Sequence, residues 1–179
     1  KKKRKKLRLL LADWSEENAL DRPDPWWRAG TIPASLFFTV VRCQTIEDAY
    51  KALDKYDPEP GDEVEIWCHA SPGAPAFGPA GKREALDDDH PIWAKCKGAV
   101  VWIRGCDALR GIKGAEFANK LAARGVSVAG HLAPIGLMGH SYLVGVRAGD
   151  HKVGQAWWPV AFDGEHSGPF EPRTVWPTR

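Results

Sequence analysis

Short apolar runs alternate with amphipathic stretches through the middle of the chain, and each run ends at Gly, Pro or a polar residue. Four runs rich in β-branched and aromatic residues are the predicted strands: residues 36–41, 63–68, 99–103 and 126–130. The run 36–41 is continuous, a pattern typical of a strand buried on both faces of a parallel sheet. The repeated order of strand, helix and strand predicts an α/β domain whose mostly parallel central sheet carries helices on both faces.

Two helices are predicted between these strands. The first begins at a capping box in which Thr45 is followed three residues later by Asp48, in place of the usual Glu or Gln. The second spans about residues 113–124 and is closed by Gly125. The residues expected to face the sheet are Ile46, Ala49, Tyr50 and Leu53 in the first helix and Phe117 and Leu121 in the second.

The two ends of the chain lack this regular pattern. Residues 1–12 are predicted to be a basic arm, and residues 13–35 a Trp- and Pro-rich irregular wrap whose indoles cover the edge of the core. Residues 141–146 read as an extra strand or hairpin on the sheet edge, and residues 163–179 as a Pro-rich extended coil over the domain. We therefore expect one domain, spanning residues 13–179, with a single core.

Charge changes this picture only at the amino terminus. The 25 Lys and Arg residues nearly balance the 23 Asp and Glu residues, so the formal charge of +2 does not favour specific nucleic acid binding. Residues 1–6 are all cationic, and their mutual repulsion predicts a solvated, mobile arm. The alternatives for this arm are an address signal, a phosphate-binding segment and a site for a trypsin-like cut.

No stretch of the sequence has the length and composition of a membrane span. The apolar residues 7–12 are interrupted by Arg8 and are too few for a signal-peptide core or a membrane helix. The chain begins with Lys instead of Met, so we expect a processed product or an excerpt of a longer protein. We expect it to be soluble, either in the cytoplasm or after release as part of that larger protein. Its oligomeric state is open.

The four cysteines lack the short regular spacings of a disulfide framework or a zinc knuckle. We expect them to be mostly reduced and mostly buried. Cys106 differs in its position, because it follows the end of the predicted strand 99–103. His69 likewise follows the end of the predicted strand 63–68. Reacting groups gather beyond the carboxyl ends of parallel strands, so the imidazole and the thiol converge if these strands are neighbours.

Such a pair has the chemistry of a cysteine nucleophile. Only the thiolate attacks, and an unperturbed thiol has a pKa of roughly 8.5, so a nearby imidazole base is needed. The small residues Ala70, Gly73 and Gly105 allow a peptide to approach the backbone, and N–H groups after His69 or Cys106 can stabilise an oxyanion. The plainer alternative is a buried structural cysteine and a polar surface histidine.

Other residues near these strand ends have two interpretations each. His131 either borders the same cleft or is a structural histidine, and Asp107 either selects a basic substrate residue or caps its loop. Residues 87–90 resemble a hard-metal cluster, but consecutive carboxylates usually form a solvated turn or a helix cap. A soft-metal alternative joins four donors near the strand ends: Cys68, His69, Cys106 and His131.

The segments 65–73 and 101–111 resemble the caspase-like fold of the clan CD cysteine peptidases. They are most similar to poorly characterised bacterial members with a His-Gly-Ser-Pro-Gly loop and a Gly-Cys strand end, and the similarity continues at Gly114, Phe117, residues 121–122 and residues 128–131. In all it covers roughly residues 36–135. Caspases, gingipains, legumain and clostripain share the order of histidine first and cysteine later, on adjacent strand ends.

The resemblance implies a three-layer fold and a cysteine endopeptidase that cleaves a protein or peptide substrate without a cofactor. It implies His69 as the catalytic histidine, Cys106 as the nucleophile and the backbone near Ala70 as part of the oxyanion site. The family usually has Gly directly after the histidine, where this chain has Ala70. This departure leaves an alternative, in which the chain is a catalytically inactive caspase-like binding or assembly domain of a larger bacterial protein.

Overall fold

The computed structural model of the chain describes residues 4–15, 34–79, 81–132, 143–149 and 174–175. Seven strands form the main sheet: β1 (Arg8–Asp13), β2 (Thr39–Cys43), β3 (Glu63–Trp67), β7 (Val100–Arg104), β8 (Ser127–His131), β9 (Leu143–Val146) and β10 (Thr174–Val175). Three strands form a small sheet: β4 (His69–Ser71), β5 (Ala74–Phe77) and β6 (Glu84–Ala85). The helices are α2 (Ile46–Tyr56), the 3-10 helix η1 (Pro91–Cys96) and α3 (Gly111–Ala123).

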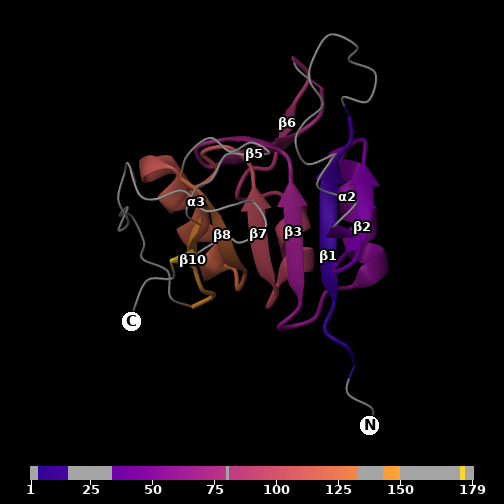
Figure 1. Ribbon diagram of the computed structural model, residues 1–179. Coiled ribbons are helices and arrows are strands. Elements are labelled where there is room, and N and C mark those ends of the chain that lie inside the picture. Colours follow the sequence, from indigo (N-terminus) through magenta and orange to yellow (C-terminus); the bar gives the residue numbers. More distant parts are fainter. Residues whose placement is uncertain (1–3, 16–33, 80, 133–142, 150–173, 176–179) are drawn as a thin grey trace.

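The strand order in the main sheet is β10-β9-β8-β7-β3-β1-β2 (Figure 1). Pairing is parallel between β2 and β1, β1 and β3, β3 and β7, and β7 and β8. Strand β9 runs antiparallel to β8, and β10 is parallel to β9 and forms the edge of the sheet. The prediction of an α/β protein with a mostly parallel sheet is therefore confirmed, as is the extra strand expected within residues 141–146.

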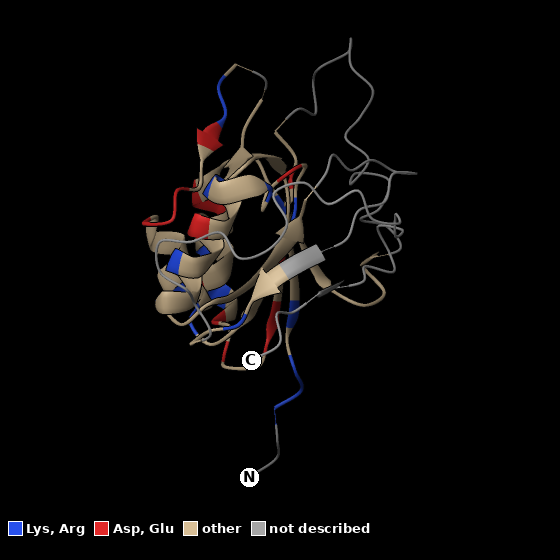
Figure 2. Cartoon of the chain, turned by 90° about the vertical axis from the view of Figure 1, so that its left-hand side faces the viewer, with Lys and Arg blue, Asp and Glu red and all other residues tan. Residues whose placement is uncertain are grey.

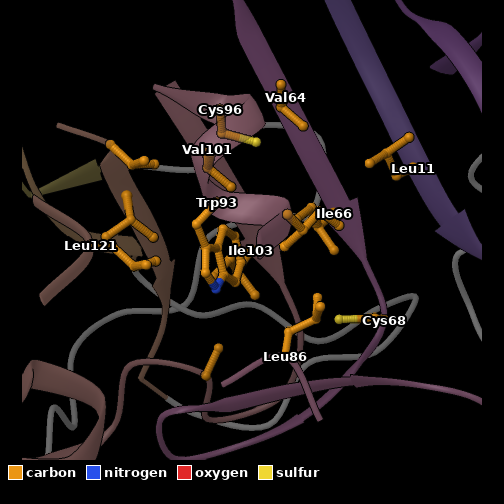
Figure 3. Close-up of a cluster of buried hydrophobic side chains, with 14 of the residues drawn as sticks. Leu11, Val64, Ile66, Cys68, Leu86, Trp93, Cys96, Val101, Ile103 and Leu121 are labelled. Carbon is orange, nitrogen blue, oxygen red and sulfur yellow. The ribbon is translucent and has the colours of Figure 1, made fainter. Parts of the chain in front are cut away.

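One face of the main sheet carries the larger core. Alternate residues of the central strands, such as Leu11, Ile66 and Ile103, pack there against the buried sides of α2, η1 and α3. The indole of Trp93 meets the ring of Phe117 edge to face, with centroids 5.7 Å apart. Figure 3 shows this cluster, and Figure 2 shows the helices gathered on one side of the sheet. A second cluster occupies the opposite face and contains Leu10, Ala12, Trp14, Ala34 and Trp67.

Within the described residues, the helices therefore lie on one face of the sheet. Most of the predicted wrap, residues 16–33, lies outside those residues, as does the C-terminal coil apart from β10. None of the helices in the described part of the chain combines the length and the apolar character needed to cross a membrane.

The helix start at Thr45 is confirmed. The Thr45 hydroxyl accepts a hydrogen bond from the Asp48 amide at 3.2 Å, and the Asp48 carboxylate accepts one from the Thr45 amide at 3.1 Å. Asp therefore completes the capping box as Glu does elsewhere, because its shorter side chain still reaches the cap backbone.

The predicted strand 36–41 is displaced towards its carboxyl end. Residues 34–38 form a helical turn in which the Phe37 and Phe38 amides both donate to the Ala34 carbonyl, and β2 begins at Thr39. Leu36 is 79% exposed and Phe37 66% exposed. Burial on both faces is also wrong for this strand, because β2 forms the edge of the sheet and is only partly covered. Apolar composition alone does not distinguish an edge strand from a central one.

The expected basic arm ends earlier than predicted. Residues 8–13 form β1, which lies between β2 and β3 in the sheet, so the folded domain includes the chain from Arg8 onwards. The residues just before β1 are also held in place. Arg4 pairs with Glu59 and Asp62, while Lys6 and Arg8 pair with Glu63 at 2.7 and 2.8 Å. Opposite charges at the start of β3 thus outweigh the mutual repulsion of the cations.

Acid is expected to weaken this attachment. Partial burial by itself raises the pKa of Glu63, but the hydrogen bonds and charges of Lys6 and Arg8 outweigh burial and hold that pKa below its ordinary value. A carboxylate with a lowered folded-state pKa contributes stability above its unfolded-state pKa of about 4.3. This contribution is lost as the pH falls through the folded-state pKa.

Urea unfolding at a series of pH values from about 6 to about 3 measures this effect. The Glu63→Gln variant is expected to lose unfolding free energy less steeply with acid than the wild type does. Glu47→Gln, at a largely exposed position of α2, serves as the control and is expected to keep the wild-type slope. Equal slopes for all three proteins contradict the role of Glu63.

Candidate active site

The ends of β3 and β7 lie side by side at the carboxyl edge of the main sheet. These strands are parallel neighbours, and Trp67 is paired with Arg104. A Cβ atom added to Gly105 would lie 3.0 Å from the Cys68 carbonyl oxygen and 2.6 Å from the Ala70 Cβ. The close approach of the two chains therefore continues past the last strand pair. His69 and Cys106 each lie two residues beyond this last pair.

His69 begins a strand and not the loop that its Gly- and Pro-rich surroundings predict. It is the first residue of β4, which pairs with β5 through Ser71 and Ala74. Pro72 and Gly73 form the intervening turn, and the positive φ of Gly73, 74°, is typical of the third position of a type II turn. In Figure 1 this small sheet lies above the arrowheads of β3 and β7.

The β4–β5 turn is fixed against the loop that contains Cys106. The Gly73 amide donates to the Ala108 carbonyl at 2.9 Å, and a Cβ added to Gly73 would lie 2.7 Å from the Lys113 carbonyl oxygen. Glycine is needed here both for its φ and for this close approach. The segment that begins at His69 and the loop that follows β7 therefore pack together.

Cys106 opens a tight loop between β7 and α3. Asp107 follows it in the left-handed region, with φ of 58°, a conformation uncommon for residues other than glycine. The Arg110 amide donates to the Asp107 carbonyl at 2.9 Å, and the Arg110 guanidinium lies 3.4 Å from the Asp107 carboxylate. The carboxylate of Asp107 thus has a partner within its own loop, as the capping interpretation requires. The exposure of Cys106 is intermediate.

His131 ends β8, and its backbone is tied to the same loop, because its carbonyl accepts a hydrogen bond from the Leu109 amide at 3.0 Å. The residue itself is only 2% exposed. This burial favours the structural interpretation of its imidazole over contact with a substrate.

Ala70, at the position where the caspase-like sequences usually have glycine, has no backbone strain. It lies within β4, and its φ is not among the positive values found in the described residues. Its side chain packs against the main core, where Gly105 leaves room for it. The Cβ of Ala70 and the missing Cβ of Gly105 are therefore complementary.

This complementarity predicts the outcome of a double-mutant cycle. Gly105→Ala is expected to cost about 1–3 kcal/mol of unfolding free energy, as overpacking of a filled site usually does. Ala70→Gly should recover part of that loss in the double variant, because it removes the nearest clashing atom. Urea unfolding of the wild type, both single variants and the double variant measures the coupling. Additive losses show that the two positions do not contact one another.

Three of the four cysteines are unsuited to nucleophilic chemistry. Burial raises the pKa of Cys43 to about 12, with smaller contributions from the charges of Asp48 and Asp13, and burial raises that of Cys96 to about 12. Burial also raises the pKa of Cys68, and a backbone hydrogen bond from Ala76 only partly opposes it. Figure 3 shows the Cys68 side chain directed into the core that contains Leu86. None of the four cysteines, all of which lie in the described residues, forms a disulfide.

The metal alternatives find no support in the described part of the chain. No group of three or more His, Cys, Asp or Glu side chains there is close enough to hold a metal ion. Within the acidic segment 87–90, Asp88 pairs with Lys120 at 3.0 Å and with Arg124 at 3.8 Å. His90 instead caps η1, since its Nδ1 accepts a hydrogen bond from the Ile92 amide.

A buried polar group near the carboxyl ends of β3 and β7 was not predicted from the sequence. Glu65 and Arg104 lie in β3 and β7, both nearly inaccessible to solvent, and Arg104 Nη2 donates to Glu65 Oε1 at 3.4 Å. The Trp67 indole donates to the other Glu65 oxygen at 2.6 Å. The sequence does contain a signal for this group, because each of two apolar strands carries a charged residue. Burial of a charged side chain is costly unless the charge is paired and hydrogen-bonded.

Asp13 is a second residue that was not singled out. It ends β1 and is buried, and its carboxylate accepts hydrogen bonds from the Gly78 amide at 3.2 Å and from the Ser15 amide at 3.0 Å. The bond to Gly78 ties the chain just after β5 to the carboxyl edge of the main sheet. Asp13 thereby helps to hold the small sheet, and with it His69, in position.

Comparison of the sequence with protein-family models gives no match, and comparison with curated proteins gives none either. The functional assignment therefore depends on the chemistry and placement of these residues.

Proposed function

We propose that the chain is a cysteine endopeptidase in which His69 and Cys106 form the catalytic dyad. The observation that carries the proposal is the register of β3 and β7, since Trp67 pairs with Arg104 and the chains remain in contact at Gly105 and Ala70. A histidine and a partly exposed cysteine thus follow adjacent strand ends at the edge where parallel sheets hold their reacting groups.

The dyad performs hydrolysis in two halves. His69 takes the proton of the Cys106 thiol, and the thiolate attacks the carbonyl carbon of the scissile peptide, forming a C–S bond while an electron pair moves to the oxygen. Backbone N–H groups near Ala70 stabilise that oxyanion. The tetrahedral intermediate collapses to a thioester, the C–N bond breaks, and His69 gives its proton to the leaving amine.

Water completes the cycle. His69 removes a proton from the water as it attacks the thioester carbonyl, so a C–O bond forms. The C–S bond then breaks, the carboxylic acid product leaves, and the Cys106 sulfur regains the proton. The reaction consumes one water and needs no metal or redox cofactor.

The proposal includes a three-layer caspase-like fold, of which the mostly parallel sheet and one helical layer are described. The order of histidine before cysteine on neighbouring strands, together with the segments 65–73 and 101–111, supports this finer assignment. The strand conformation of Ala70 supports activity, because the departure from the usual glycine requires no unusual backbone angle.

Selective labelling of Cys106 tests the proposal. A peptidyl acyloxymethyl ketone, which alkylates catalytic thiols, is incubated with the folded and reduced full chain, and the modified residue is identified by mass spectrometry. We expect modification of Cys106, because the other three thiols are buried and have raised pKa values.

Two comparisons make the labelling specific. His69→Ala is expected to abolish labelling by the ketone while iodoacetamide, which needs only accessibility, still reaches Cys106. Cys43→Ala is the matched control and should label as the wild type does. A folded wild type whose Cys106 does not react with the ketone contradicts the proposal, and leaves the chain a non-catalytic binding or assembly domain.

A further inference from the structure

Asp107, the residue directly after Cys106, has a backbone conformation that side chains with a Cβ seldom adopt. Its φ of 58° lies in the left-handed region, and among the described non-glycine residues only Asp57 shares a positive φ, of 45°. This region is disfavoured for most residue types, although Asp and Asn enter it more readily than the others. Asp57 caps the end of α2, where left-handed residues are common. Asp107 ends no helix, so its conformation needs another explanation.

Residues 105–108 form a tight turn that has Cys106 at its tip. The Ala108 amide donates to the Gly105 carbonyl at 3.4 Å, which is the bond that closes a β-turn. Cys106 is not among the residues with a positive φ, whereas Asp107 is. This combination is that of a type II turn, whose third residue is usually Gly or Asn. The left-handed residue beside Cys106 therefore sets the course of the chain at the proposed nucleophile.

The chain is fixed on both sides of this tip. Gly105 packs against β4, where an added Cβ would lie 2.6 Å from a side-chain atom. Ala108 and Leu109 are fully buried, and their backbone groups bond to the β4–β5 turn at 2.9 Å and to the end of β8 at 3.0 Å. Only Cys106 and Asp107 connect these two fixed parts, so the chain must change direction within them. The φ of Asp107 provides that change and thereby determines where Cys106 lies.

The charge of Asp107 contributes less to this turn than its backbone does. Its carboxylate lies 3.4 Å from the Arg110 guanidinium, but that guanidinium is half exposed, so the ion pair adds little stability. The Asp107 carbonyl also accepts a hydrogen bond from the Arg110 amide at 2.9 Å, and any residue type offers this carbonyl. What distinguishes Asp at this position is its tolerance of the left-handed region, which Asn and Gly share.

We propose that Asp107 is a positioning residue, whose left-handed backbone holds the Cys106 thiol in place for its reaction with His69. This inference rests on the proposed peptidase function, because it concerns the geometry of the same dyad. A residue that resists the left-handed region displaces Cys106 from its working position, while the thiol stays accessible. Strained backbone persists at functional sites where the surrounding structure enforces a geometry that the reaction needs.

Substitutions at position 107 separate the backbone effect from the charge. Asp107→Asn removes the charge, and Asp107→Gly removes the whole side chain, but both keep access to the left-handed region. Both should therefore retain most of the rate at which the peptidyl acyloxymethyl ketone alkylates Cys106. Asp107→Val is similar in size but β-branched, and it should lower that rate about 5- to 150-fold, the range for strain at one backbone position. Asp107→Ala should fall between them, and it replaces the valine variant if that protein does not fold.

The readout distinguishes positioning from general stability. Iodoacetamide needs only an accessible thiol, so its rate with Cys106 should change far less than the ketone rate in Asp107→Val. Asp57→Val is the matched control, since it puts the same side chain on a left-handed residue at the end of α2. It should lower Tm by about 2–8 °C and leave the ketone rate at the wild-type value. Rates are measured by intact-protein mass spectrometry.

Three results overturn the positioning role while the peptidase proposal stands. The first is an equal ketone rate for folded Asp107→Asn and Asp107→Val, because backbone preference then has no effect. The second is an equal fall of the ketone and iodoacetamide rates, which reports access alone. The third is an equal loss in Asp57→Val, which reports general destabilisation. A folded wild type that reacts with iodoacetamide but not with the ketone contradicts the peptidase proposal, and this inference with it.

Discussion

Replacement of Cys106 by alanine is expected to abolish peptide hydrolysis, with a loss of at least about 1000-fold in kcat/KM for the best substrate. The side chain that forms the thioester is then missing, and a bound water has no comparable nucleophilicity. His69→Ala should cost a similar factor, since the thiol keeps its proton without the base. The double variant should be no worse than either single one, because the two residues act as a unit.

A peptide library from a proteome digest supplies the substrates, and mass spectrometry of the new amino termini identifies the bonds cleaved. Cys43→Ala is the matched control, because it removes a buried thiol from the end of β2. Activity that survives Cys106→Ala contradicts the dyad. A folded wild type that cleaves no peptide in the library contradicts the assignment as an endopeptidase.

Gly114→Ala is expected to destabilise the fold strongly, by about 3 kcal/mol, the upper part of the range for overpacking. In an exposed helix interior the same change usually stabilises by up to about 1 kcal/mol. Here the added Cβ would lie 2.2 Å from the Leu109 carbonyl carbon and 2.5 Å from the Leu109 Cα and carbonyl oxygen. These atoms belong to backbone, so no side-chain rotation relieves the overlap.

The effect of Gly114→Ala should reach the proposed site, because Leu109 lies in the loop that begins at Cys106 and bonds to the end of β8. Urea unfolding measures the stability, and the rate of Cys106 labelling reports the loop. Glu116→Ala, at an exposed position two residues further along α3, should change neither. A Gly114→Ala protein as stable as the wild type contradicts the tight contact between α3 and this loop.

The sequence by itself was sufficient for much of the architecture. Val64 and Ile66 are two residues apart, as are Val101 and Ile103, and both pairs are buried. Apolar β-branched residues at this spacing face the same side of a strand, so they predict a strand with a buried face. Thr45 and Asp48 fixed a helix start because capping depends on residues three apart in the chain. Such interactions are local, so they can be predicted without knowing the fold.

Other features depend on partners distant in the chain. Residues 8–12 were predicted to belong to a basic arm. They form a strand instead, because they pair with the distant segments 39–43 and 63–67. The segment that begins at His69 was predicted to be a loop. It forms a strand of the small sheet instead, which is stabilised by pairing between short strands and by the contact of Gly73 with Ala108. Burial of Leu36 and Phe37 was expected from composition, yet both lie exposed in the helical turn before β2.

His69 and Cys106 illustrate both sides of this division. Their residue types and their places after two apolar runs were evident in the sequence, and they defined the candidate dyad. Only the tertiary structure decided that the two runs are neighbouring parallel strands whose last pair, Trp67 and Arg104, lies two residues before each of them. It alone also revealed that Arg104 Nε and Nη1 have no hydrogen-bond partner among the described residues, because burial and hydrogen bonding across strands depend on the folded chain and not on local sequence.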